Sequence, residues 1–322
     1  MKWKTGVLIF VSLLILAGIV LFLNPAELVR TIASANPVYI LYGFIFANLA
    51  LVCRVYKWKV LLPGISFGKL APVQFFGITV SNLTPGKIGE PVKTMALKAV
   101  DGTPISVSLP SVIWERIMDV LVLILFGLSG ISLIAAADYL PLIVLSVVIF
   151  SVLIAFLFLI MYSEQAGRKA IGLFKRFPVL KKIDEEFLTN FYRGCRISHV
   201  SLLGSFAWTL VAWLLDGMAF YAVYLALAPA PVDLVLPVMF TCILALSVLI
   251  GLLSFLPGGV GGTEVVMILI LSAAGIPHDI GGSTVLIGRA LTFGWSIVAG
   301  YVAFVYLSRK VDTGEITKMV GL

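Results

Sequence analysis

The sequence predicts an all-α polytopic membrane protein, a chain whose helices cross the bilayer several times. Of its 322 residues, 61% are hydrophobic and 12% are charged, whereas a soluble domain carries about 25% charged residues. Several apolar stretches approach or exceed the roughly 20 residues that a helix needs to cross the hydrocarbon core. Pro-Gly interruptions at Pro85 and Pro257 break this pattern twice. We therefore expect about six full spans together with two re-entrant hairpins built from broken helices.

The first half of the chain contains three predicted spans and one predicted hairpin. Residues 5–23, 38–53 and 106–135 form the spans. An Ala-x-Ala site lies ten residues past the first apolar run, which favours a retained helix over a cleaved signal peptide. Residues 71–102 split at Pro85 into two segments too short to cross, so they are predicted to form a hairpin that returns to the side it left. A basic cluster closes the second span: Arg54, Lys57 and Lys59.

The second half repeats this arrangement. Residues 140–162, 202–227 and 286–307 are predicted spans, and residues 235–276 are predicted to form the second hairpin around Pro257. A polar loop at 163–198 holds eight Lys/Arg and four Asp/Glu residues. Within it, the stretch "KKIDEEF" predicts a short amphipathic helix on the membrane surface.

The net charge of +7 indicates topology rather than nucleic-acid binding. With the N-terminus in the cytoplasm, 20 of the 23 Lys/Arg residues fall on the cytoplasmic side, including the loop at 163–198. The outer side receives Arg30, and the spans hold Arg116 and Arg289. This asymmetry follows the positive-inside rule and predicts cytoplasmic N and C termini.

The two Pro-Gly interruptions belong to an internal repeat. Pro85 and Pro257 are 172 residues apart, and Arg116 and Arg289 are 173 apart. Three predicted spans separate the two hairpins, so the hairpins open on opposite faces. We therefore predict one membrane domain over 1–322, with an inverted-topology repeat of residues 1–135 and 138–310.

The first turn, "PGKIGE", has the chemistry of an anion site. Glycines permit unusual backbone angles and let a ligand approach the main chain. A half-helix that starts after the turn points free N–H groups at the same place, and Lys87 adds a full positive charge. The alternative is that the glycines only allow the helices to turn and pack.

Charged residues inside spans have a functional and a structural interpretation. Glu115 and Asp119 share a helical face, while Arg116 points about 100° away. A charged group at the centre of a span costs about 2.5–3.5 kcal/mol on insertion scales, so it marks an interior site or a paired group. The structural alternative is an ion-pair network that joins Glu90 or Glu264 to Arg116 or Arg289. Asp216 is an isolated carboxylate in a span, with a proton or cation role as one interpretation.

Other chemistry finds little support in the sequence. The three cysteines form no CxxC pair, and the two histidines lie apart at segment ends. No P-loop, G-x-S-x-G or H-E-x-x-H motif occurs. We therefore expect no metal, no cofactor, no nucleic-acid partner and no enzymatic activity.

The stretches "TPGKIGEPVKTMAL", "WERIMD", "LPGGVGGTE" and "GRALTFGW" together resemble the flippase-like membrane region of lysyl-phosphatidylglycerol synthases. The resemblance covers about residues 5–308 and implies a polytopic helical fold that transfers polar lipids between leaflets. No aminoacyl-transferase domain accompanies it, so synthesis of the lysyl lipid is not expected. With Lys87 and Asp216 added from the residues themselves, the candidate substrate-binding residues are Pro85, Gly86, Lys87, Gly89, Glu90, Lys93, Glu115, Arg116, Asp119, Asp216, Pro257, Gly258, Gly259, Gly261, Glu264 and Arg289.

The leading hypothesis is a flippase- or scramblase-like protein that moves anionic or aminoacylated phospholipids or polyprenyl-phosphate lipids. Its partners would be membrane lipids in a prokaryotic plasma membrane. An ion-coupled secondary transporter and an accessory subunit in cell-envelope glycolipid assembly remain as alternatives. A homo-oligomer or a lipid-modifying enzyme partner is also compatible with the sequence.

Overall fold

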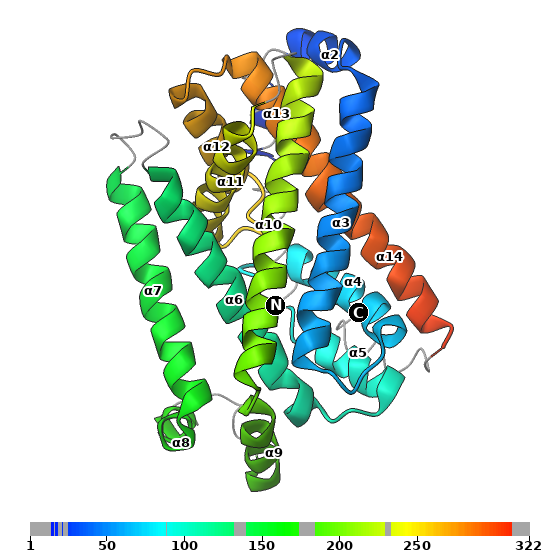
Figure 1. Ribbon diagram of the computed structural model, residues 1–322, viewed down its shortest axis with the longest axis vertical. Helices are drawn as coiled ribbons and strands as arrows, with labels where there is room; N and C mark the ends of the chain where they lie inside the picture. The colour runs from blue at the N-terminus through cyan, green and yellow to red at the C-terminus, as the bar shows by residue number, and fades with distance from the viewer. Residues whose placement is uncertain are drawn as a thin grey trace.

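The described part of the chain consists of helices and the turns between them (Figure 1). The computed structural model describes residues 25–87, 89–131, 140–173, 184–228 and 233–310, together with a few residues between 14 and 21. Most of the predicted first span at 5–23 and the tail at 311–322 lie outside the described residues. Within the described residues no strand is present, and the predicted all-α polytopic class is confirmed.

Five helices of the described chain are long and apolar enough to cross a membrane. They are Pro37–Leu61, Val144–Tyr162, His199–Leu227, Val235–Leu253 and His278–Ser308. The last combines α13 (His278–Arg289), a π-helical segment η3 (Ala290–Gly294) and α14 (Trp295–Ser308). Helix α6 (Ile105–Ile131) has 27 residues, also enough to cross, but it carries three charged side chains near its middle.

Helix α3 (Pro37–Leu61) is longer than the sequence predicted. Asn36 caps its start, because the Asn36 side chain accepts a hydrogen bond of 3.0 Å from the Val38 N–H. The predicted end at Cys53 is wrong, and the helix continues for two further turns to Leu61. The reason is that Arg54 and Lys57 find carboxylate partners inside the protein rather than water at the interface.

Two pairs of helices joined by Pro-Gly turns lie close to the segments predicted as hairpins, and their re-entrant path in the membrane stays a prediction. The first joins α4 (Phe67–Leu83) to α5 (Val92–Asp101), and the second joins α11 (Val235–Leu253) to α12 (Gly262–Ala273). In Figure 1 the first hairpin lies in the lower half of the molecule and the second in the upper half. The two hairpins therefore approach the middle from opposite ends.

Short helices lie at the two ends of the bundle (Figure 1). Helix α2 (Pro25–Ala33) lies at the upper end, and α8 (Glu164–Leu173) and α9 (Glu185–Cys195) lie at the lower end. The amphipathic helix predicted at "KKIDEEF" starts later than expected, because Asp184 caps α9 through the Phe187 N–H at 2.7 Å. Its apolar face is buried: Leu188, Phe191, Tyr192 and Cys195.

Each hairpin belongs to its own apolar cluster. One cluster contains Phe220 of α10 (His199–Leu227), Ile243 of α11 and Met267 of α12. The other contains Trp58 of α3 and Leu70 of α4, together with residues of α5 and α14. Polar contacts between α4 and the last helix fix the first hairpin, since Thr79 donates a hydrogen bond of 2.9 Å to the Ser296 carbonyl. The polar residues described below lie where the two hairpins meet.

Candidate functional site

The tips of the two hairpins touch. Pro85 and Pro257 form an isolated antiparallel bridge between the two Pro-Gly turns. Because these prolines are 172 residues apart in the chain, the fold brings the two repeated motifs to one point.

The two turns also share one backbone geometry. In the first, the Lys87 N–H donates to the Thr84 carbonyl at 3.2 Å, and in the second the Gly259 N–H donates to the Leu256 carbonyl at 2.9 Å. The glycine after each proline has a positive φ, 59° at Gly86 and 61° at Gly258. Proline followed by a residue with positive φ is typical of a type II turn.

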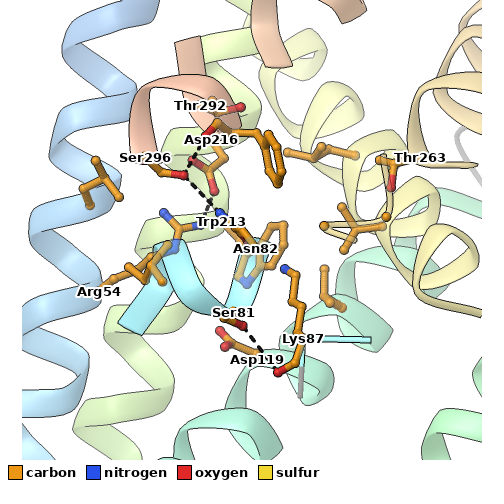
Figure 2. Close-up of a pocket in the computed structure, with 18 of the residues that line it drawn as sticks. Arg54, Ser81, Asn82, Lys87, Asp119, Trp213, Asp216, Thr263, Thr292 and Ser296 are labelled. Carbon is orange, nitrogen blue, oxygen red and sulfur yellow. Dashed lines mark hydrogen bonds and ion pairs between the residues drawn. The ribbon is translucent and has the colours of Figure 1, made fainter. Parts of the chain in front are cut away.

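Lys87 stands out because it is a lysine in a left-handed backbone conformation. Its φ is 59°, and the equivalent residue in the second turn is Gly259 with a φ of 67°. The left-handed region costs roughly 1–2 kcal/mol for a residue with a side chain. Such an outlier suggests a functional reason for the side chain. Figure 2 shows the Lys87 side chain reaching into a cavity beside the turns.

This central cavity has a volume of about 130 Å³. Apolar side chains such as Trp213 and Phe220 form part of the wall. The polar part of the wall comes from both hairpins and from α3, α6, α10 and the last helix. Its residues are Arg54, Lys57, Gln74, Ser81, Asn82, Lys87, Glu90, Glu115, Arg116, Asp119, Asp216, Gly258, Gly259, Thr263, Arg289, Thr292 and Ser296.

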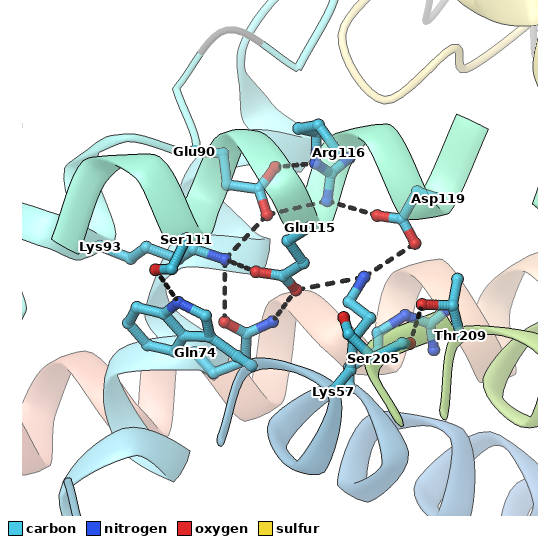
Figure 3. Close-up of polar contacts among 12 residues, drawn as sticks. Lys57, Gln74, Glu90, Lys93, Ser111, Glu115, Arg116, Asp119, Ser205 and Thr209 are labelled. Atoms are coloured by element: carbon cyan, nitrogen blue, oxygen red, sulfur yellow. Dashed lines mark hydrogen bonds and ion pairs between the residues drawn. The ribbon is translucent and has the colours of Figure 1, made fainter. Parts of the chain in front are cut away.

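Glu115 is the centre of a buried ion network on one side of the cavity (Figure 3). Its side chain is fully buried. One carboxylate oxygen lies 3.1 Å from Lys57 Nζ and accepts a hydrogen bond of 2.8 Å from Gln74 Nε2. The other oxygen is paired with Lys93. Glu115 therefore compensates two buried ammonium groups at once.

Arg116 links this network to the cavity. It forms ion pairs with both oxygens of Glu90, and its Nη2 lies 2.9 Å from Asp119 Oδ2. Asp119 in turn accepts a hydrogen bond of 2.8 Å from Lys57. Arg116 is the most exposed member, with 34% of its side chain accessible, whereas Lys57 and Lys93 are almost fully buried.

A second Glu–Arg pair occurs in the other half of the molecule. Arg289 Nε lies 2.6 Å from Glu264 Oε1, and Arg289 also donates to the Gly258 carbonyl at 3.2 Å. The other oxygen of Glu264 accepts from the Gly261 N–H at 2.6 Å and so caps α12. The structure therefore shows the ion pairs that the sequence left as the structural alternative, one beside each Pro-Gly turn.

Asp216 is not the isolated carboxylate that the sequence suggested. It forms an ion pair with Arg54 of α3, and the Arg54 guanidinium also lies 5.8 Å from the centre of the Trp213 ring. The prediction failed because the two partners are 162 residues apart and the sequence placed Arg54 outside the span.

A comparison with known protein families identifies the family. Residues 9–300 match the family described as the lysylphosphatidylglycerol synthase TM region. The chain belongs to this family. A UPF0104 membrane protein of Methanocaldococcus jannaschii is 21% identical, with 96% of each chain covered. A UPF0104 membrane protein of Methanothermobacter thermautotrophicus is 26% identical over 99% of this chain and 100% of that protein.

In this member of the lysylphosphatidylglycerol synthase TM-region family, the cavity collects nine of the candidate residues predicted from the sequence. They are Lys87, Glu90, Glu115, Arg116, Asp119, Asp216, Gly258, Gly259 and Arg289. The remaining candidates lie behind the wall, where they form the turns or pair with wall residues: Pro85, Gly86, Gly89, Lys93, Pro257, Gly261 and Glu264.

Eight polar residues of the cavity wall were not among the candidates predicted from the sequence: Arg54, Lys57, Gln74, Ser81, Asn82, Thr263, Thr292 and Ser296. Lys57 and Arg54 were assigned to a basic cluster at the membrane surface, and Gln74 was not singled out. Lys57 is 1% exposed and joins Glu115 to Asp119. Arg54 and Lys57 share one face of α3, but the sequence alone did not show that the helix continues past Cys53.

Proposed function

We propose that this protein moves polar lipids between the leaflets of a prokaryotic plasma membrane, in the manner of a flippase or scramblase. Membership of the lysylphosphatidylglycerol synthase TM-region family supports a role in lipid biology. The protein is a polytopic membrane protein, and its similarity to archaeal membrane proteins fits a prokaryotic source.

The observation that carries the proposal is the position of Lys87. It occupies a strained backbone position at the tip of a hairpin, and its side chain reaches into the cavity. No salt bridge to Lys87 is seen among the described residues, whereas each other cation of the cavity wall has a carboxylate partner. Lys87 is half-buried, and a charge partly removed from water without a protein partner is costly, so a lipid phosphate is the natural counterion.

The arrangement of the hairpins supports transfer from one side to the other. Helices α8 and α9, with Arg168, Lys169 and Arg193, lie at the lower end in Figure 1, which the positive-inside rule makes the cytoplasmic end. The first hairpin would then be open to the cytoplasm and the second to the outside. Inverted repeats with discontinuous helices are typical of alternating access around a central site.

In this proposal the protein moves the lipid without making or breaking any of its covalent bonds. The headgroup would occupy the cavity while the apolar chains remain in the surrounding lipid. The ion-coupled alternative rests on the same hairpin architecture, and the ion pair of Asp216 with Arg54 makes Asp216 a weaker candidate for its coupling site.

The experiment is reconstitution into vesicles that carry a trace of phospholipid labelled on an acyl chain, with chemical quenching of the label in the outer leaflet. We expect exchange that depends on the wild-type protein, and a rate about tenfold lower for Lys87→Gly, since a hydrogen bond to a charged group contributes about 1.5–3 kcal/mol. The matched control is Lys87→Arg, which keeps the charge and should keep most of the rate. Absence of protein-dependent exchange for anionic and zwitterionic phospholipids and polyprenyl phosphates alike would refute the proposal.

A further inference from the structure

We infer that the central cavity selects lipids whose headgroup carries one phosphate charge and uncharged hydroxyls, and that it discriminates against headgroups bearing an amine. This inference rests on the proposed function and names the substrate class of the same site. The family description refers to a lysylated lipid, and the charge pattern of this chain points to a different headgroup chemistry.

The carboxylates around the cavity are already compensated by protein cations. Glu90, Glu115 and Asp119 share Lys57, Lys93 and Arg116. Asp216 is paired with Arg54, and Glu264 is paired with Arg289. An ammonium group that leaves water needs a carboxylate or an equivalent set of acceptors. In the described part of the site, no carboxylate is left without a protein cation to provide that charge.

The same site has an excess of one positive charge. Six cationic side chains, namely Arg54, Lys57, Lys87, Lys93, Arg116 and Arg289, face five carboxylates, and the unmatched cation is Lys87. A phosphodiester carries one negative charge, so it neutralises this excess. A lysylated headgroup would add positive charge next to Lys87, Arg116 and Arg289.

Neutral hydrogen-bond acceptors border the space that Lys87 enters (Figure 2). The Thr292 hydroxyl donates its proton to the Gly288 carbonyl at 2.8 Å, and the Ser296 hydroxyl donates to the Phe293 carbonyl at 2.7 Å. Each hydroxyl oxygen is then left mainly as an acceptor, although Ser296 also accepts from Asn82 at 3.0 Å. Such oxygens accept hydrogen bonds from the hydroxyl groups of a glycerol or another polyol, and they carry no negative charge to compensate an ammonium group.

The size of the cavity agrees with a small polyol headgroup. Its volume of about 130 Å³ admits several water-sized groups at once, as a phosphate with the hydroxyls of a glycerol requires.

The test compares phosphatidylglycerol with its lysylated derivative in the same vesicles of phosphatidylcholine, each labelled on an acyl chain. For the wild-type protein we expect phosphatidylglycerol to exchange about tenfold faster or more, because unit charges of like sign near a protein surface repel by several kcal/mol at contact. Equal rates, or faster exchange of the lysylated lipid, would overturn the inference and leave lipid transport standing. Absence of exchange for both would instead count against the proposed function.

Two variants make the charge argument specific. Lys87→Glu changes the balance to five cations and six carboxylates, so the preference should reverse in favour of the lysylated lipid. Lys87→Gly removes the excess charge and should bring the two exchange rates close together. Glycine suits this backbone position, because the equivalent residue of the second turn is Gly259. Size-exclusion profiles and melting temperatures show whether each variant is folded. A folded variant of either kind that keeps the wild-type preference would contradict the inference.

Discussion

Lys87 and Gly259 occupy the same left-handed backbone position in two Pro-Gly turns that are 172 residues apart. Only the second turn has a glycine at this position, and glycine is the residue that the left-handed conformation favours. The lysine therefore has a conformational cost at a place where its side chain reaches a cavity, and this leads to the first prediction.

Lys87→Gly is expected to leave the protein as stable as the wild type or more stable by up to about 1 kcal/mol. Relief of left-handed strain contributes roughly 1–2 kcal/mol, and the flexibility of glycine in the unfolded chain offsets part of it. Thermal unfolding in detergent measures the difference. A clear loss of stability would mean that the Lys87 side chain supports the fold, and the functional interpretation would fail.

The bridge between Pro85 and Pro257 predicts a disulfide that locks the two hairpins together. Paired strand residues have Cα atoms about 4.5–5.5 Å apart, which lies within the range that a disulfide accepts. We expect Pro85→Cys combined with Pro257→Cys to cross-link under oxidation and to lose lipid exchange, with recovery after reduction. Exchange that continues in fully cross-linked protein would show that the turns need not separate.

Two controls accompany the cross-link. The single variants Pro85→Cys and Pro257→Cys should keep their exchange activity under oxidation. The native cysteines Cys53, Cys195 and Cys242 are buried, and burial raises the pKa of Cys195, on surface helix α9, to about 12. A thiol with a raised pKa stays protonated at neutral pH and reacts poorly, so Cys195 should not compete.

Glu115→Gln should be strongly destabilising. The substitution leaves Lys57 and Lys93 buried with less negative charge nearby, and removal of one partner from a buried ion pair costs about 3–5 kcal/mol. Addition of Lys93→Gln should restore part of the loss, because it removes one of the uncompensated charges. Glu185→Gln, at an exposed ion pair with Arg168, is the surface control and should change the melting temperature little. Equal effects at Glu115 and Glu185 would argue against a buried network.

Gly300 is predicted to be required for packing of α14 against α4. A Cβ atom at Gly300 would lie 2.6 Å from the Phe75 carbonyl oxygen, whereas a Cβ atom at Gly64 would meet nothing within 4 Å. Gly300→Ala should therefore cost about 1–3 kcal/mol through overpacking, and Gly64→Ala should be close to neutral. Both variants carry the same chemical change, and thermal unfolding measures the stability of each. A neutral Gly300→Ala would show that the two helices can separate without penalty.

The sequence was sufficient to predict the helical class, the two Pro-Gly turns that join paired helices, and many residues of the cavity wall. Apolar length and Pro-Gly breaks are local features, and the fold follows them closely. The residues that were misjudged depend on distant partners. Lys57 meets Asp119 62 residues away, and Arg54 meets Asp216 162 residues away. A basic residue after an apolar run has the same sequence pattern whether it meets water or a buried carboxylate, so the end of α3 could not be predicted.

The inverted topology of the two repeats remains a prediction. The bridged turns and the two Glu–Arg pairs are features that an inverted repeat would produce, and the opposite approach of the two hairpins agrees with it (Figure 1). The direction of each hairpin relative to the membrane can be measured by labelling single cysteines from either side.

The central claim is that Lys87 holds the headgroup of a lipid in the cavity between the two turns. The most direct measurement is mass spectrometry of the lipids retained by purified wild-type and Lys87→Gly proteins. We predict that the wild type retains an anionic phosphodiester lipid, and that folded Lys87→Gly loses most of it. Equal retention of the same lipids by both proteins would contradict the claim.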